Sequence, residues 1–314
     1  MSNQVTSSIL MIRPVSFNAN PETAQNNYYQ KLIEGLSPEQ AQEKALFEFN
    51  HFVDVLKEKG IDVVVVDDTS DPETPDAVFP NNWISFHHDG TIALYPMFAE
   101  SRRLERRDDI IDILKENGFV IERVRDYTAF EHQSKYLEGT GSMILDRDNH
   151  ILYAALSART NQDVLETFAE DFSYKLIAFN ANQSVAGKRE PIYHTNVLMG
   201  LTDKIAIICL ETIDNKDERN AVVDSLKSTG KEIIEITEDQ VNYFAGNILG
   251  LKNRNDEEFL IMSDVARKAF SENQIENIKT YYEIISAPLD TIEALGGGGA
   301  RCMIAEVFLP KTEV

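Results

Sequence analysis

One cysteine and one histidine have sequence settings that suit nucleophilic catalysis. Cys302 closely follows residues 296–299, which are all glycine. The uncovered backbone N–H groups of such a run can approach a ligand and donate to developing negative charge, and a cysteine beside it is a nucleophile when its thiolate is stabilised. His194 begins a predicted β-hairpin, as Cys302 does, and is a candidate general acid and base. The alternative interpretations are a simple glycine loop, a buried cysteine and a packing histidine.

Charged side chains elsewhere could bind a substrate, although each also has a structural interpretation. The arginines within residues 101–107 could clamp a carboxylate or form a solvated helix face, and Arg159 has the same two interpretations. Asp76 lies in a predicted turn, where capping is a common role. His87 and His88 are adjacent but have no third ligand at suitable spacing, so we expect no metal site.

The elements that must position these residues form a repeat. Two apolar or β-branched runs around a short polar turn recur along the chain, which is the pattern of a β-hairpin. In the first of them Asp89 and Gly90 occupy the turn. The hairpins start at residues 82, 141, 196, 247 and 302, at intervals of 59, 55, 51 and 55 residues that contain helical patterns. The last hairpin lacks a second strand, and residues 8–13 are the candidate for it.

A repeat of this length indicates a repeat architecture, including radial ones, in which the ends of the chain share one unit. An open α/β sheet with coincidental spacing is the alternative. In a ring the first residues of the hairpins would converge near the axis. The residues brought into one pocket would then be Asn82, Glu138 to Gly141, His194, Asn247 and Cys302.

Composition excludes several classes of function. The 314 residues include 30 Lys and Arg against 52 Asp and Glu, so the formal net charge is −22. We therefore expect no nucleic-acid partner and no anionic membrane surface. No apolar run approaches the roughly 18 residues of a spanning helix, and we expect no targeting segment at the first residues. Two cysteines predict no disulfide framework and a cytoplasmic location.

Several ordered motifs resemble those of the pentein, or amidinotransferase, superfamily of guanidine-modifying enzymes. Within it, the chain is similar to dimethylarginine dimethylaminohydrolase-like and arginine deiminase-like enzymes, from about Asp76 onward. The motifs are Pro75-Asp-Ala-Val-Phe-Pro-Asn-Asn82, Ser101-Arg102-Arg103, Leu137-Glu-Gly-Thr-Gly141, Leu156-Ser-Ala-Arg-Thr-Asn161, His194 and Cys302.

This resemblance implies a fold and a set of roles. The fold would be α/β, a five-bladed propeller of ββαβ-type repeats around a central active site, in one domain over residues 1–314. Cys302 would attack the central carbon of a guanidino or ureido group, His194 would act as general acid and base, and Glu138 would hold His194 or a substrate nitrogen. No metal or organic cofactor is implied. The α-carboxylate of an amino-acid-like substrate would bind to Arg102 and Arg159, and its α-amino group to Asp76.

The sequence departs from the family pattern where that pattern has two carboxylates that grip a cationic guanidinium. Asn81 and Asn82 occupy those positions. An amide both donates and accepts, whereas a carboxylate only accepts, and a buried unpaired guanidinium is costly. Gly141 and Asn196 also replace aspartates of the family. The chain is similar here to citrulline-utilisation hydrolases, so we expect a neutral ureido substrate.

We therefore expect a cysteine-dependent hydrolase of a carbon–nitrogen bond, converting citrulline to ornithine through a covalent Cys302 adduct. The alternatives are an amidinotransferase, an arginine deiminase or dimethylarginine hydrolase, and a non-catalytic pentein scaffold. The expected partner is a small amino-acid-like molecule. The oligomeric state stays open, with a homodimer as one option, and residues 18–46 are a candidate lid.

Overall fold

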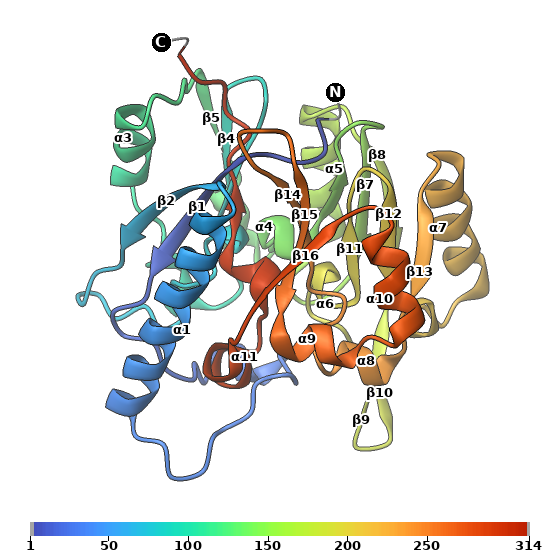
Figure 1. The fold of residues 1–314 in the computed structure, drawn as a ribbon, viewed down its shortest axis with the longest axis horizontal. Coiled ribbons are helices and arrows are strands. Elements are labelled where there is room, and N and C mark those ends of the chain that lie inside the picture. The colour runs from blue at the N-terminus through green and yellow to red at the C-terminus, as the bar shows by residue number, and fades with distance from the viewer. Residues whose placement is uncertain (1–2, 313–314) are drawn as a thin grey trace.

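The computed structural model describes residues 3–312 and consists of small β-sheets with helices around them (Figure 1). In this part of the chain, five sheets have three strands and one has two. In each three-stranded sheet the middle strand pairs antiparallel with one neighbour and parallel with the other. The predicted mixed α/β class is therefore confirmed.

Four of the three-stranded sheets each come from one continuous stretch of chain, and the fifth joins strands from both ends of the described residues. Their strands are β3 (Ile84–Phe86), β4 (Thr91–Leu94) and β5 (Arg123–Asp126); β6 (Ile144–Asp146), β7 (Ile151–Ala155) and β8 (Lys175–Phe179); β11 (Met199–Leu201), β12 (Ile205–Ile208) and β13 (Glu232–Glu235); β14 (Leu249–Lys252), β15 (Glu258–Ser263) and β16 (Glu283–Ala287); and β17 (Ala305–Glu306), β1 (Ser8–Arg13) and β2 (Asp62–Asp67).

Two expectations about strand pairing are confirmed. The strands β3 and β4 form an antiparallel hairpin whose turn ends at Gly90, and this glycine has a φ of +77°, which a side chain would disfavour. The strand β1 pairs with β17, with Ile9 opposite Glu306 and Leu10 opposite Ala305. The last predicted hairpin therefore takes its second strand from the N-terminal run.

The starts of the predicted hairpins need correction, because the first strands are preceded by single helical turns. His194 caps such a turn and Cys302 lies within one, so neither residue begins a strand. The turns pack closely against one another: a Cβ on Gly139 would lie 2.2 Å from the backbone oxygen of Asn81. These turns are η2 (Pro80–Asn82), α4 (Gly139–Ser142), α6 (Thr195–Leu198) and η5 (Ala300–Met303).

Longer helices lie outside the sheets (Figure 1). The longest is α1 (Pro38–Glu58), with Pro38 in its first turn. Ser37 caps its N-terminus, and the side chains of Ser37 and Gln40 form a reciprocal capping box. The helix predicted over residues 101–117 is divided in two, α2 and α3, and Glu105 turns inward between them. The other helices, some of them only one turn long, are α2 (Glu100–Arg103), α3 (Asp109–Glu116), α5 (Gln162–Asp171), α7 (Lys216–Ser228), α8 (Glu238–Val241), α9 (Asp264–Ala269), α10 (Glu272–Lys279) and α11 (Asp290–Gly296).

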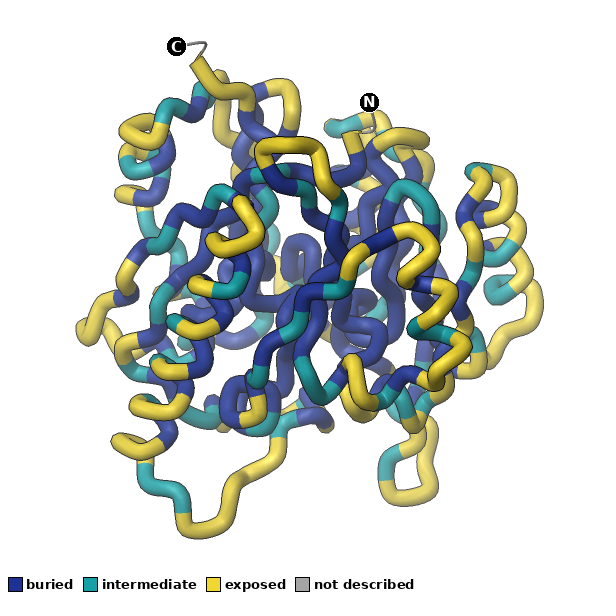
Figure 2. The backbone as a smooth tube through the Cα atoms, in the orientation of Figure 1, coloured by how far each residue is buried: buried dark blue, intermediate teal, exposed yellow. Residues whose placement is uncertain are grey.

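The buried backbone is concentrated among the strands (Figure 2). Every residue of β7 and of β12 is buried, as expected of short apolar strands covered on both faces. The remaining sheet is a hairpin of β9 (Asn182–Val185) and β10 (Lys188–Pro191), which projects from the body and was not predicted. Within residues 3–312, none of the helices has the length and apolar content needed to cross a membrane.

The two faces of α1 should respond differently to truncation. Phe52 is fully buried, whereas Phe47 on the same helix is 71% exposed. We expect Phe52→Ala to lower the free energy of unfolding by about 3–5 kcal/mol because it leaves a cavity, and Phe47→Ala to change it by less than about 0.5 kcal/mol. Denaturant unfolding of both variants tests this, and equal losses would contradict the packing described.

Candidate active site

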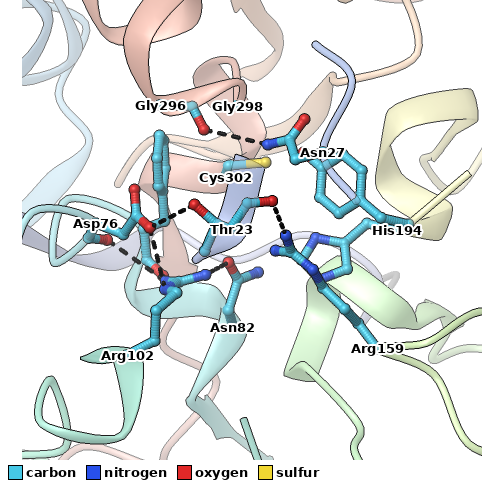
Figure 3. Close-up of a pocket in the computed structure, with 12 residues that line it drawn as sticks. Thr23, Asn27, Asp76, Asn82, Arg102, Arg159, His194, Gly296, Gly298 and Cys302 are labelled. Carbon is cyan, nitrogen blue, oxygen red and sulfur yellow. Dashed lines mark hydrogen bonds and ion pairs between the residues drawn. The ribbon is translucent and has the colours of Figure 1, made fainter. Parts of the chain in front are cut away.

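Helical turns and loops beside the first strands of the sheets enclose a small polar pocket (Figure 3). Most of the residues predicted for the site line it, while Glu138 and Asn81 lie behind the lining. The lining residues are Thr23, Asn27, Asp76, Phe79, Asn82, Arg102, Arg159, Tyr193, His194, Gly296, Gly298 and Cys302.

His194 is held by a buried carboxylate. Its Nε2 lies 2.8 Å from Oε2 of Glu138, and both side chains are almost fully buried. The backbone N–H of Phe98 donates to the other carboxylate oxygen at 3.0 Å, and Nη1 of Arg159 lies 3.4 Å from Oε2. The carboxylate thus fixes the orientation of the imidazole.

The protonation states of this pair follow from its surroundings. Burial alone would raise the pKa of Glu138, but Arg159, His194 and Arg102 outweigh burial and lower the pKa to about 2. Burial lowers the pKa of His194 to about 4, although Glu138 opposes that change. At neutral pH the carboxylate is therefore ionised and the imidazole neutral. Because Nε2–H must donate to Glu138, Nδ1 is the nitrogen that can accept a proton.

Cys302 is buried and lies between two asparagine side chains. Nδ2 of Asn247 is 3.2 Å from Sγ, and Nδ2 of Asn196 is 3.3 Å from it. Burial raises the pKa of the Cys302 thiol, and hydrogen bonds from both amides oppose that rise. The sequence analysis expected Asn247 near the axis of the ring and described Asn196 as the replacement of a family aspartate. It did not predict that either side chain contacts the sulfur of Cys302.

Arg102 is paired with a carboxylate that the sequence analysis missed. Its Nε and Nη2 donate to the two oxygens of Glu105 at 2.8 and 2.9 Å, inside the protein. Burial raises the pKa of Glu105 to about 7 despite this partner. Nη1 of Arg102 also donates to Oδ1 of Asn82 at 2.7 Å. The three-residue spacing from Arg102 to Glu105 was the available signal for the pair.

The two adjacent asparagines have different positions. The Asn82 amide lines the pocket, and its Nδ2 donates to Oδ1 of Asn81 at 3.1 Å. The side chain of Asn81 donates to Thr140 instead. A Cβ on Gly141 would lie 2.4 Å from Nδ2 of Asn82 and 2.7 Å from Nδ1 of His194. The glycine at position 141 thus lets His194 and Asn82 come close together.

Arg159 contacts the N-terminal segment that precedes α1. Its Nε and Nη2 donate to Oδ1 of Asn26 at 2.8 and 2.5 Å, and Nη2 also donates to the backbone oxygen of Thr23 at 2.8 Å. The guanidinium carbon lies 4.7 Å from the ring centre of Tyr193. Neutral oxygens of the protein therefore occupy the donors that the resemblance reserves for a substrate carboxylate.

Asp76 has one satisfied and one unsatisfied oxygen. Oδ2 accepts from Nδ2 of Asn20 at 2.9 Å and from Oγ1 of Thr23 at 3.2 Å. Oδ1 is buried, and no hydrogen-bond partner for it exists among the described residues. Burial raises the pKa of Asp76, and Arg102 is the main group that opposes the rise. A buried acceptor without a partner is a position where a ligand N–H can bind.

The same N-terminal segment also covers the glycine run. Nδ2 of Asn27 donates to the backbone oxygens of Gly296 and Gly297 at 3.3 and 3.2 Å, and Nε2 of Gln30 donates to that of Leu295. Residues 20–30 therefore form one wall of the pocket, whereas residues 38–46 belong to α1. The use of this wall as a lid stays a prediction.

The described residues contain no group of three or more His, Cys, Asp or Glu side chains placed to hold a metal ion. His87 is instead buried, with its ring 4.1 Å from that of Phe172, centre to centre.

Comparison with known proteins adds to this geometry. Residues 13–309 match the family model described as N,N dimethylarginine dimethylhydrolase, eukaryotic. No curated protein sequence matches the chain.

Solved structures with the same fold include ArgZ, described as an arginine dihydrolase from the ornithine-ammonia cycle in Cyanobacteria. The apo structure has a TM-score of 0.74 at 19% identity, and the match covers 97% of this chain but only 41% of ArgZ. The product-bound N-terminal domain of ArgZ has a TM-score of 0.69 at 21% identity, with 96% and 99% covered. A dimethylarginine dimethylaminohydrolase adduct with S-methyl-L-thiocitrulline has a TM-score of 0.65 at 15% identity, with 95% and 98% covered.

The buried neutral imidazole should make stability depend on pH. The pKa of His194 in the folded protein, about 4, is below the usual 6.5, so the unfolded chain binds the proton more readily. We expect this residue to lower the free energy of unfolding by up to about 3 kcal/mol between pH 7 and pH 4. His194→Asn should make the pH dependence shallower in denaturant titrations. His150→Asn, at an exposed histidine, is the control, and equal slopes in all three proteins would contradict the assignment.

Proposed function

The chain belongs to the N,N-dimethylarginine dimethylhydrolase family, within the pentein superfamily of guanidino-modifying enzymes, and on this basis we propose that it hydrolyses a carbon–nitrogen bond of a ureido or guanidino amino acid. The solved structures support this class, since one is described as an arginine dihydrolase and another as an adduct with S-methyl-L-thiocitrulline. The preferred substrate is citrulline.

The observation that carries the proposal is a cysteine and a neutral, carboxylate-held imidazole on the wall of one pocket. Nδ1 of His194 would take the thiol proton as Sγ of Cys302 attacks the ureido carbon, and the imidazolium would return it to the leaving nitrogen. The carbon–nitrogen bond to the ornithine portion breaks, which leaves a carbamoyl group on the sulfur. Water, activated by the same imidazole, releases carbamate, which decomposes to ammonia and carbon dioxide.

The α-carboxylate and the α-ammonium group of an amino-acid substrate would each find a partner on the wall of the pocket. Its α-carboxylate would bind Arg159, with Arg102 nearby, in place of the neutral oxygens of Asn26 and Thr23. Its α-ammonium group would donate to the unsatisfied oxygen of Asp76. Because Asn26 and Thr23 occupy the donors of Arg159, residues 20–30 would have to move when a carboxylate binds there, and this supports their use as a lid.

A neutral reacting group is favoured by the amides around it. Asn82 presents an amide where the family pattern has a carboxylate, and the Glu138 carboxylate is already bound by His194 and Arg159. Complete hydrolysis of arginine to ornithine is the second candidate, because a structural relative is described as an arginine dihydrolase. Transfer to an amine in place of water, and a scaffold without activity, have weaker support because no observed residue favours either.

The arrangement of the sheets supports the proposed ring and the single domain over residues 1–314. Elements of consecutive sheets contact each other, as β17 contacts β3 and β11 contacts both β6 and β14. The turns η2, α4 and α6 also contact in succession. Closure is supported by contacts of η5 with η2 on one side and with β15 on the other.

Product analysis tests the proposed reaction. Wild type and Cys302→Ala are incubated separately with citrulline and with arginine, and ornithine, citrulline, urea and ammonia are quantified. We expect wild type to release ornithine and ammonia in equal amounts from citrulline, and the variant to release neither. Ornithine from arginine alone would favour the second candidate, and no product from either substrate would contradict the proposal.

The two asparagines should differ in their effect on substrate choice. Asn82→Asp places a negative charge on the pocket wall, so we expect kcat/KM for arginine relative to citrulline to rise about tenfold or more. Asn81→Asp is the matched control, because its side chain faces Thr140, and we expect a change below about threefold. Steady-state kinetics with both substrates measures the ratios. Equal effects of the two changes would show that Asn82 does not select the reacting group.

A further inference from the structure

We propose that Asn247 and Asn196 together form an amide cradle that stabilises the thiolate of Cys302 and fixes the direction of its sulfur. This inference rests on the proposed nucleophilic role of Cys302. It assigns a role to Asn247, which lies two residues before β14 and outside the motifs of the resemblance.

Asn247 binds Cys302 at two points. Its Nδ2 donates to Sγ at 3.2 Å, and its Oδ1 accepts the backbone N–H of Cys302 at 3.3 Å. Because both ends of the amide are used, the side chain cannot rotate without losing one of these bonds. Nδ2 also donates to the backbone oxygen of Asn196 at 3.0 Å, which ties the two asparagines together. Both are almost fully buried, with 1% and 0% of their surface exposed.

Asn196 supplies the second donor from a different unit of the fold. It lies in α6, two residues after His194, and its Nδ2 is 3.3 Å from Sγ. Two N–H groups from separate units therefore converge on one sulfur atom. Hydrogen bonds to the charged form of a group favour that form. A neutral pair of donors can thus stabilise a thiolate without placing a cation against it, which suits a pocket for a neutral substrate.

The charged and titratable groups around the sulfur do not provide this stabilisation by direct contact. Two cations, Arg301 and Arg102, lower the pKa of Cys302, but they form ion pairs with Glu306 and Glu105 respectively. The neutral imidazole of His194 is bound to Glu138 through Nε2. Tyr193 donates its hydroxyl to Gly297. On α11, burial raises the pKa of the buried Glu293 carboxyl to about 8, so it is neutral at pH 7.

The reactivity of Cys302 in the absence of substrate tests the cradle. Asn247→Asp and Asn196→Asp each keep the side-chain shape but replace a donor with an acceptor. The rate of alkylation by iodoacetamide is followed from pH 6 to pH 10, and mass spectrometry identifies the labelled cysteine. We expect each variant to react at least tenfold more slowly at pH 7 and its midpoint to move upward by about one pH unit or more. Turnover of citrulline should fall with the thiolate fraction and recover in part at higher pH.

Two controls separate this effect from a loss of folding. Asn255→Asp makes the same chemical change in the exposed turn between β14 and β15 and should leave the profile unchanged. Cys209 is fully buried and burial raises its pKa to about 12, so it should stay unlabelled in every folded variant. Wild-type alkylation profiles in both cradle variants, with Cys209 protected, would overturn the proposal. A shifted profile in an enzyme that hydrolyses no ureido or guanidino compound would leave the cradle intact and reject the proposed function.

Discussion

The carboxylate of Glu138 is the group on which the arrangement of the pocket depends. It accepts a backbone N–H from Phe98, holds His194 at 2.8 Å and lies within 4.0 Å of both Arg159 and Arg102. A buried carboxylate is costly unless it is paired and hydrogen-bonded, and these partners come from three separate parts of the chain. Their positions are therefore linked through one charge. If any partner moved away, the buried carboxylate would lose part of the pairing that offsets the cost of its burial. The surrounding turns are therefore held in one arrangement.

The two buried arginines of the pocket are each paired with a carboxylate before any ligand arrives. Arg102 is matched by Glu105 and Arg159 by Glu138, while oxygens of the N-terminal segment fill the remaining donors of Arg159. A ligand with both a carboxylate and an ammonium group can replace such internal contacts without changing the net charge of the site. This pairing offsets the cost of keeping strongly polar groups buried.

Local patterns were sufficient for the parts of the fold that local chemistry determines. The alternation of β-branched residues identified the hairpins, and Asp89 with Gly90 identified a turn, because glycine permits the positive φ that the turn needs. The motifs identified His194, Cys302 and most of the pocket lining. Glu105 escaped because a continuous helix over residues 101–117 favoured a solvated face for its charged residues, whereas Glu105 is buried where that helix breaks. Asn20 and Asn26 escaped because their partners lie more than 50 residues away. The β9–β10 hairpin escaped because its polar strands carry no apolar alternation.

The pairing of β1 with β17 has a consequence for synthesis on the ribosome. Translation must reach residue 306 before Ile9 meets its antiparallel partner, although β2 is available to the other edge of β1 much earlier. Until then one edge of β1 is unpaired, and its residues, which are mostly buried in the folded protein, are exposed. Unpaired apolar strand edges of this kind can pair with other chains. The same late segment brings Cys302. The segment that closes this edge thus also carries the proposed nucleophile, so the sheet and the proposed site are completed by the same stretch of chain.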